Sequence, residues 1–155
     1  MEKEKIKIDE LLKSGQTVAF RPQGYSMYPV IVPGRDYVVV APVKAETLKR
    51  GDVAVYRRYG GECGPGGSKL VIHRVHRHKK DGIYMIGDSE FKVEGPLKHE
   101  QFYGIMTELY RKDKRISVRN PFYRFLTGTW LFMRPVRPVI TKLVVWIKKP
   151  FRKNK

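Results

Sequence analysis

The sequence predicts a mainly β domain with a short N-terminal helix and a basic amphipathic helical tail at its C-terminal end. Short apolar runs, alternating or continuous and bounded by turn residues, are typical of strands. The composition then changes near residue 111, where basic and aromatic residues begin to alternate with aliphatic ones. At 155 residues with 41% hydrophobic content, the chain is long enough for one core and short for two. We therefore expect a β domain at residues 1–118 and a tail at residues 119–155.

The elements of the β domain follow from this pattern in chain order. Residues 6–12 predict an amphipathic helix that ends near Gly15. Strands are predicted at residues 17–21, 36–42, 52–58, 69–78, 82–86 and 101–110, with a further one near 115–118. The segments 32–36 and 80–82 contain the glycine, proline and aspartate residues that turns need.

The stretch Gly24-Tyr25-Ser26-Met27-Tyr28-Pro29 places a hydroxyl in a glycine-led turn. Pro29 disfavours helix at Tyr28, so we expect Ser26 in a turn or in extended chain. A serine hydroxyl becomes a nucleophile only when a base takes its proton. The sequence must therefore supply a base further along.

His73 is the candidate base, because it lies inside the predicted strand at residues 69–78. Alternation places it on one face of that strand with Val71 and Val75. The ordinary histidine pKa of about 6.5 lets a neutral imidazole accept a proton near pH 7. Gly87-Asp88-Ser89 follows, which gives the order serine, histidine, acid.

Four motifs in this order resemble those of the signal peptidase I family. They are a G-x-S-M-x-P box at residues 24–29, an R-G-D-V box at 50–53, an H-R-V box at 73–75 and a G-D box at 87–88. The H-R-V box is similar to that of the endoplasmic-reticulum and archaeal members, which use histidine where bacterial-type members use lysine. The resemblance implies a coiled antiparallel β-sheet and a serine endopeptidase that cleaves signal or leader peptides from precursors. It also implies Ser26 as nucleophile, His73 as base, and an extended substrate, paired to strand edges, with small side chains before the cleaved bond.

The third catalytic residue departs from the family pattern, which places an aspartate several residues after the G-D box. Glu94 stands at that position here, and Asp88 is the other candidate. Either carboxylate could orient the imidazole from within hydrogen-bond reach of Nδ1. We favour Glu94 and expect Asp88 to fix the turn through its own backbone.

The oxyanion hole is a second departure, because bacterial-type members often have a serine two residues before the nucleophile. Gly24 stands there and offers no side-chain donor. The developing oxyanion is therefore expected to depend on backbone N–H groups, above all that of Ser26.

The last part of the chain, from residue 111, carries most of the net positive charge. Residues 1–110 hold 18 basic and 14 acidic residues, whereas residues 111–155 hold 14 basic and 1 acidic, a net charge of +13. This composition favours an amphipathic segment on an anionic membrane surface, and it makes nucleic acid a less favoured partner. We expect a helix near residues 121–133, a break at 134–138 and a second helix to about Lys148, none of them crossing the bilayer.

The remaining features concern location and cofactors. A single cysteine, Cys63, excludes an intrachain disulfide, and we expect no cofactor and no metal. Residues 1–8 have no apolar core of a secretion signal, and no N-terminal membrane anchor is expected. The protein is thus predicted to be peripheral on a membrane or cytoplasmic. The alternative function is a catalytically inactive peptide-binding or regulatory module at a membrane surface.

Overall fold

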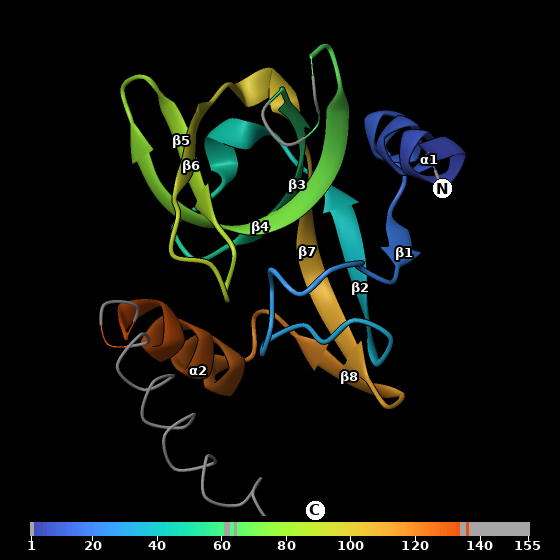
Figure 1. The fold of residues 1–155 in the computed structure, drawn as a ribbon. Coiled ribbons are helices and arrows are strands. Elements are labelled where there is room, and N and C mark those ends of the chain that lie inside the picture. The colour runs from blue at the N-terminus through green and yellow to red at the C-terminus, as the bar shows by residue number, and fades with distance from the viewer. Residues whose placement is uncertain (1, 61–62, 64, 134–135, 137–155) are drawn as a thin grey trace, which may run out of the picture.

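In a computed structural model that describes residues 2–60, 63, 65–133 and 136, eight strands form one antiparallel sheet (Figure 1). The strand order is β1-β2-β7-β3-β4-β5-β6, and β8 pairs with β7. The strands are β1 (Val18–Phe20), β2 (Asp36–Pro42), β3 (Val53–Tyr59), β4 (Ser68–Lys79), β5 (Gly82–Ile86), β6 (Glu94–Leu97), β7 (Phe102–Arg111) and β8 (Lys114–Ser117). Two single-turn 3-10 helices, η1 (Ala45–Thr47) and η3 (His99–Gln101), lie between strands. The predicted mainly β fold is confirmed.

The predicted strands agree with the structure within one or two residues at each end, and β6 is the strand that the sequence prediction omits. Its residues include Gly95 and Pro96, which are both unfavourable in a strand interior. The strand is tolerated because it lies at the edge of the sheet, where it pairs with β5 alone. Glu94 begins this strand, so the omission concerns a candidate site residue.

Alternation divides the apolar residues between the two faces of the sheet. Val53, Val55 and Ile72 belong to one buried cluster, and Ala54, Tyr56 and Val75 belong to another. Because Ala54 is the cross-strand partner of His73, the two residues share a face with Tyr56. The predicted facing of His73 with Val71 and Val75 is confirmed.

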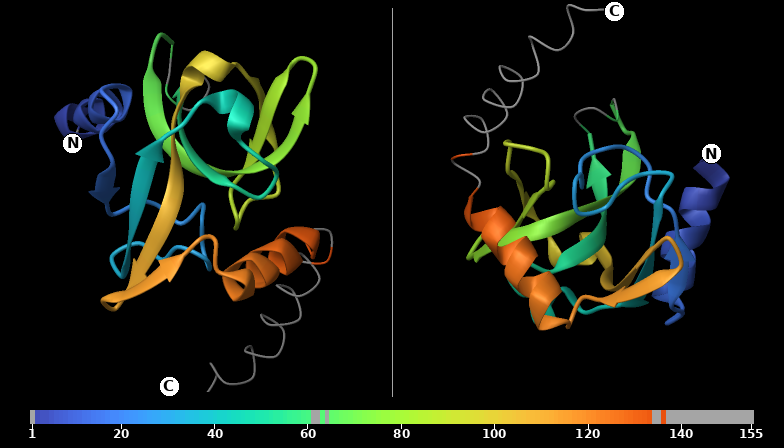
Figure 2. Two further views of the ribbon diagram at one scale, coloured as in Figure 1. Left: turned by 180° about the vertical axis from the view of Figure 1, so that it is seen from behind. Right: turned by 90° about the horizontal axis from the view of Figure 1, so that it is seen from below.

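The long strand β4 changes partner along its length. It pairs with β3 from Ser68 to Arg74 and with β5 from Arg74 to Lys79, with a register shift between Val75 and Arg77. In both figures this strand is strongly bent, as bulged strands are (Figures 1 and 2). Within the described sheet, the first half of β4 therefore has one edge that no strand covers.

Two helices flank the sheet. Helix α1 (Glu2–Lys13) lies beside β1, and helix α2 (Pro121–Phe132) lies at the other side of the molecule (Figure 2). Asn120 caps α2, because its Oδ1 accepts a hydrogen bond of 2.8 Å from the N–H of Phe122. This helix confirms the one predicted near residues 121–133.

Helix α2 packs on the β domain through one of its faces. Thr127 and Leu131 are buried, and the indole Nε1 of Trp130 donates to the carbonyl oxygen of Asp88 at 3.0 Å. No helix among the described residues is long and apolar enough to cross a membrane. The predicted break at residues 134–138, apart from Val136, and the predicted second helix lie outside the described residues.

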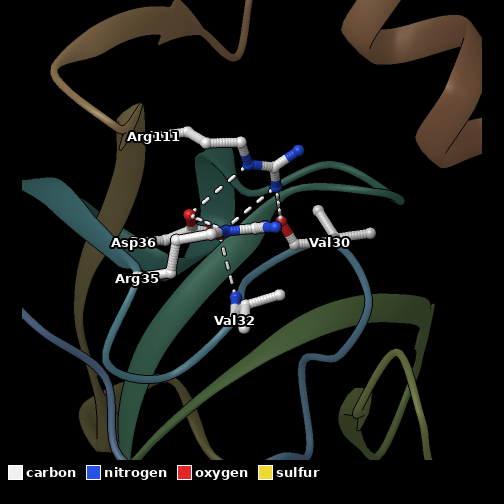
Figure 3. A network of polar contacts seen from close by, with 5 residues as sticks. All are labelled: Val30, Val32, Arg35, Asp36 and Arg111. Carbon is white, nitrogen blue, oxygen red and sulfur yellow. Dashed lines mark hydrogen bonds and ion pairs between the residues drawn. The ribbon is translucent and has the colours of Figure 1, made fainter.

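A buried carboxylate fastens the segment that follows the Ser26 turn (Figure 3). Asp36 is fully buried and accepts hydrogen bonds from the Val32 N–H at 2.9 Å, from Arg35 at 2.7 Å and from Arg111 of β7. Burial alone would raise the pKa of Asp36, but these donors outweigh it and lower the pKa to about 2. Arg111 also donates to the Val30 carbonyl at 2.7 Å, so the network ties this segment to the sheet.

Candidate functional site

Ser26 lies in a turn that is hydrogen-bonded to the loop after β5. The backbone N–H of Ser89 donates to the Ser26 carbonyl at 2.9 Å, and the Ser89 hydroxyl donates to the Tyr25 carbonyl at 2.7 Å. A Cβ atom at Gly87 would lie only 2.6 Å from the Ser26 carbonyl oxygen. Glycine at position 87 therefore allows the two loops to come into contact. The predicted turn conformation of Ser26 is confirmed.

The other two motifs join this framework through Arg74. Its guanidinium donates to both carboxylate oxygens of Asp88 at 2.7 Å, and its Nη1 donates to the Gly51 carbonyl at 2.7 Å. The Gly51 N–H returns a bond of 2.9 Å to the Val75 carbonyl. The Arg74–Asp88 pair is almost fully buried. Burial alone would lower the pKa of Arg74, but the charge and hydrogen bonds of Asp88 help hold it above its usual value. Hydrogen bonds thus link the R-G-D-V, H-R-V and G-D boxes directly, and Ser89, which follows the G-D box, links them to the G-x-S-M-x-P box.

Ser26 and His73 line one groove of about 780 Å³. Its walls come from the chain between Phe20 and Ser26 and from the first half of β4. Ser26 is half-buried at this groove, while the His73 side chain is only 2% exposed. Among the described residues, no hydrogen bond joins the two side chains.

Polar groups lie near both ring nitrogens of His73. Its Nδ1 lies 3.1 Å from the hydroxyl of Tyr56 and 3.8 Å from a carboxylate oxygen of Glu94. Its Nε2 lies 3.8 Å from a carboxylate oxygen of Glu90, another residue that lines the groove. The pKa of His73 is lowered to about 4, chiefly because burial disfavours the charged ring and secondly because Arg58 is near. His73 is consequently neutral at pH 7.

Glu94 is held by Arg58 and Tyr56. The Arg58 Nε donates to one carboxylate oxygen at 2.7 Å, and its Nη2 donates to the other. The Tyr56 hydroxyl donates to that second oxygen at 2.5 Å. Partial burial of Glu94 would raise its pKa, but Arg58 and Tyr56 outweigh it, so the pKa of Glu94 is below its ordinary value. Glu94 is therefore a carboxylate at neutral pH.

The structure separates the two candidate acids. Glu94 lies on the Nδ1 side of His73, whereas the Asp88 side chain pairs with Arg74, whose neighbouring position in β4 places it on the opposite face from His73. That pairing was not part of the sequence prediction, in which Asp88 acts through its backbone. Gly24, the predicted oxyanion-turn residue, lines the groove with φ of 82°, a conformation that glycine adopts readily.

Three residues of this site are absent from the sequence prediction: Tyr56, Arg58 and Glu90. The first two could have been found from strand alternation, because they follow Ala54 at steps of two, and Ala54 faces His73 across the ladder. Glu90 lies in the loop after β5, where no periodicity indicates direction.

Comparison of this chain with family models, with curated proteins and with solved structures finds no match.

Proposed function

We propose that the protein is a serine endopeptidase of the signal peptidase I type that removes signal or leader peptides from precursors. The observation that carries this proposal is the hydrogen-bonded linkage of the four motifs beside the groove that Ser26 and His73 share. A chance set of motifs would have no reason to meet in space. The proposal is supported by the Ser26 hydroxyl and the neutral His73 imidazole, which line one groove, and by the Glu94 carboxylate on the Nδ1 side of the ring, since acyl transfer uses these groups.

The reaction runs in two stages. The Ser26 Oγ attacks the scissile carbonyl carbon and forms an O–C bond, while His73 takes the hydroxyl proton. The tetrahedral intermediate collapses as the C–N bond breaks, and His73 returns the proton to the leaving amine. Water then attacks the acyl-enzyme with the same base, which releases the new C-terminus and restores Ser26. The oxyanion would be held by backbone N–H groups such as that of Ser26.

The uncovered edge of β4 offers a place for the substrate backbone. Residues 69–73 of β4 line the groove, and no described strand pairs with their second edge. An extended peptide added there would pair with β4 and pass along His73 toward Ser26. Apolar side chains such as Phe20, Leu70 and Ile72 also line the groove, which suits small apolar side chains before the cleaved bond.

The second part of the proposal is a peripheral position on an anionic membrane through residues 119–155. On α2, Phe122, Phe125, Leu126 and Phe132 are each more than half exposed. Exposed aromatic side chains beside a strongly basic segment favour the interface of an anionic bilayer. Helix α2 is joined to the Asp88 loop by Trp130, so a membrane bound at α2 would lie close to the site. The alternative location is the cytoplasm, where the enzyme would trim leader peptides.

A cleavage assay tests the enzymatic proposal. Purified protein is incubated with precursor peptides that carry small-x-small sites, with and without anionic vesicles. Ser26→Ala and His73→Ala are compared with Ser14→Ala and His78→Ala, which change an exposed serine and an exposed histidine away from the groove. We expect cleavage by the wild type and by both control variants, and loss by at least about a hundredfold in Ser26→Ala and His73→Ala.

The same assay distinguishes the peptidase from the alternative function, a catalytically inactive peptide-binding module. A wild-type protein that binds these peptides without cleaving them, with affinity unchanged by Ser26→Ala, would contradict the enzyme and support a peptide-binding module.

A further inference from the structure

Tyr56 stands between His73 and the acid that the sequence assigns to it. Its side chain is completely buried, and its hydroxyl lies 3.1 Å from Nδ1 of His73 and 2.5 Å from a carboxylate oxygen of Glu94. The direct separation of Nδ1 from that oxygen is 3.8 Å, which is too long for a hydrogen bond. Among the described residues, the hydrogen-bonded connection from Glu94 to the imidazole therefore passes through the tyrosine.

The donor and acceptor of each hydrogen bond between His73, Tyr56 and Glu94 can be assigned by counting protons. Glu94 is a carboxylate held by two donors of Arg58, so it can only accept. Two oxygens at 2.5 Å need a proton between them, and the single Tyr56 proton is the one available, since burial and Glu94 both raise the pKa of this phenol. With its proton directed to Glu94, the Tyr56 oxygen can only accept from His73. The ring nitrogen at 3.1 Å must then be a donor, Nδ1–H.

We propose that Tyr56 is a positioning residue that holds His73 in the Nδ1–H tautomer, with the Nε2 lone pair directed to the groove, and connects the ring to the Glu94 carboxylate. The inference deepens the proposed function and rests on it for its catalytic consequence. The tautomer is the one that a base acting through Nε2 requires. When Nε2 takes the Ser26 proton, the imidazolium keeps its Nδ1–H bond to Tyr56, whose own bond to the carboxylate strengthens it.

The site has further features that agree with this role. Among the described residues, Nε2 of His73 makes no hydrogen bond; the carboxylate of Glu90 lies 3.8 Å away, and the lone pair is directed to the groove that Ser26 lines. Arg58 fixes both oxygens of Glu94, so the carboxylate is held in place toward Tyr56. The Tyr56 ring also packs against Phe102, with the two ring centroids 5.6 Å apart, and this contact restricts the rotation of the tyrosine ring.

The test has one structural and one kinetic readout. Nitrogen-15 NMR of labelled protein at neutral pH reports which ring nitrogen of His73 carries the proton. Peptide cleavage is measured for Tyr56→Phe and Glu94→Gln, with Tyr84→Phe as the matched control, because Tyr84 also donates to a carboxylate, Asp81, but on an exposed hairpin. Circular dichroism of each variant checks that it folds.

We expect the wild type to show Nδ1–H and no Nε2–H, and Tyr56→Phe to gain an Nε2–H signal. We expect kcat to fall by about 10²-fold in Tyr56→Phe and in Glu94→Gln, with KM changed less than threefold and Tyr84→Phe near the wild type. Wild-type His73 in the Nε2–H form would overturn the inference even if Tyr56→Phe does not fold. An unchanged kcat in folded Tyr56→Phe would also overturn it.

The NMR result does not depend on peptidase activity. If the wild type cleaves no peptide, the proposed function fails, whereas the tautomer of His73 still supports or overturns the hydrogen-bond assignment.

Discussion

At the scale of single residues, the site depends on a buried histidine that stays neutral. His73 has little water to stabilise its charged form, and Arg58 opposes the charge further, which together outweigh Glu94 and Asp88. A buried neutral imidazole is ready to accept a proton at pH 7, although its basicity is reduced. Two measurable consequences follow for activity and for stability.

The first consequence concerns the pH dependence of cleavage. Because the pKa of His73 is about 4, the acidic limb of kcat/KM is expected nearer pH 4 than the ordinary histidine value of 6.5. In Glu94→Gln the limb should move to still lower pH, since the charge of Glu94 raises the His73 pKa. Initial rates between pH 3.5 and 8 would decide this. A limb near pH 6.5 in the wild type would contradict the buried environment.

The second consequence concerns stability. The unfolded chain binds a proton at His73 below about pH 6.5, whereas the folded protein does so only below about pH 4. Stability is therefore expected to fall by up to about 3 kcal/mol as the pH drops through this window. Urea unfolding of the wild type, His73→Gln and the exposed control His78→Gln measures the difference.

His73→Gln should be the variant whose stability loses this pH dependence. An equal slope of stability against pH in the wild type and His73→Gln would show that His73 titrates normally.

Asp36 contributes to stability in a lower pH range. Its folded pKa is about 2, so its stabilisation is lost only as the pH falls from 3.8 toward 2.

At the scale of elements, the close approach of two loops positions Ser26, the proposed nucleophile. Gly87→Ala would place a methyl group 2.6 Å from the Ser26 carbonyl oxygen, so the Ser26 turn must move. We expect cleavage to fall by at least about tenfold, because displacements near 1 Å at a catalytic group cost this much or more.

Gly128→Ala is the matched control for this variant. Gly128 lies in α2, and a Cβ there meets nothing within 4 Å, so the change should leave cleavage unchanged and stabilise the helix by up to about 1 kcal/mol. Normal cleavage by Gly87→Ala would indicate that the contact between the loops does not position Ser26.

The elements also show how far sequence reasoning reaches. The strands β2 and β5 were predicted with their observed bounds, because apolar residues end at turn residues on both sides. β6 was omitted because Gly95 and Pro96 outweigh its short apolar pattern. The family resemblance indicates Glu94. Alternation puts Tyr56 on the same face as His73, but it does not indicate that the tyrosine hydroxyl reaches both His73 and Glu94. The pairing of Asp88 with Arg74 likewise depends on tertiary contacts.

At the scale of the whole molecule, the C-terminal segment combines most of the net positive charge with the exposed aromatic side chains Phe122, Phe125 and Phe132 of α2. We expect the protein to sediment with anionic vesicles and to be released as salt rises, because screening weakens its attraction to the surface. The double variant Phe122→Ser, Phe125→Ser should bind at least about threefold less, since both side chains are exposed on α2.

Tyr59→Ser serves as the control for vesicle binding. Tyr59 is 60% exposed but lies at the end of β3, away from α2 (Figure 1). Equal loss of binding in the control and in the double variant would indicate a general effect of surface polarity, and it would contradict a membrane-facing α2.

The central claim is that Ser26 becomes covalently acylated with His73 as its base. Mass spectrometry of acid-quenched protein, after mixing with a peptide ester that carries a small-x-small site, measures this directly. After digestion of the quenched protein, we predict that the fragment containing Ser26 gains the mass of the acyl group. This adduct should be absent in Ser26→Ala and should form at least about a hundredfold more slowly in His73→Ala. No adduct in the wild type, an adduct on another residue, or an equal rate in His73→Ala would contradict the account.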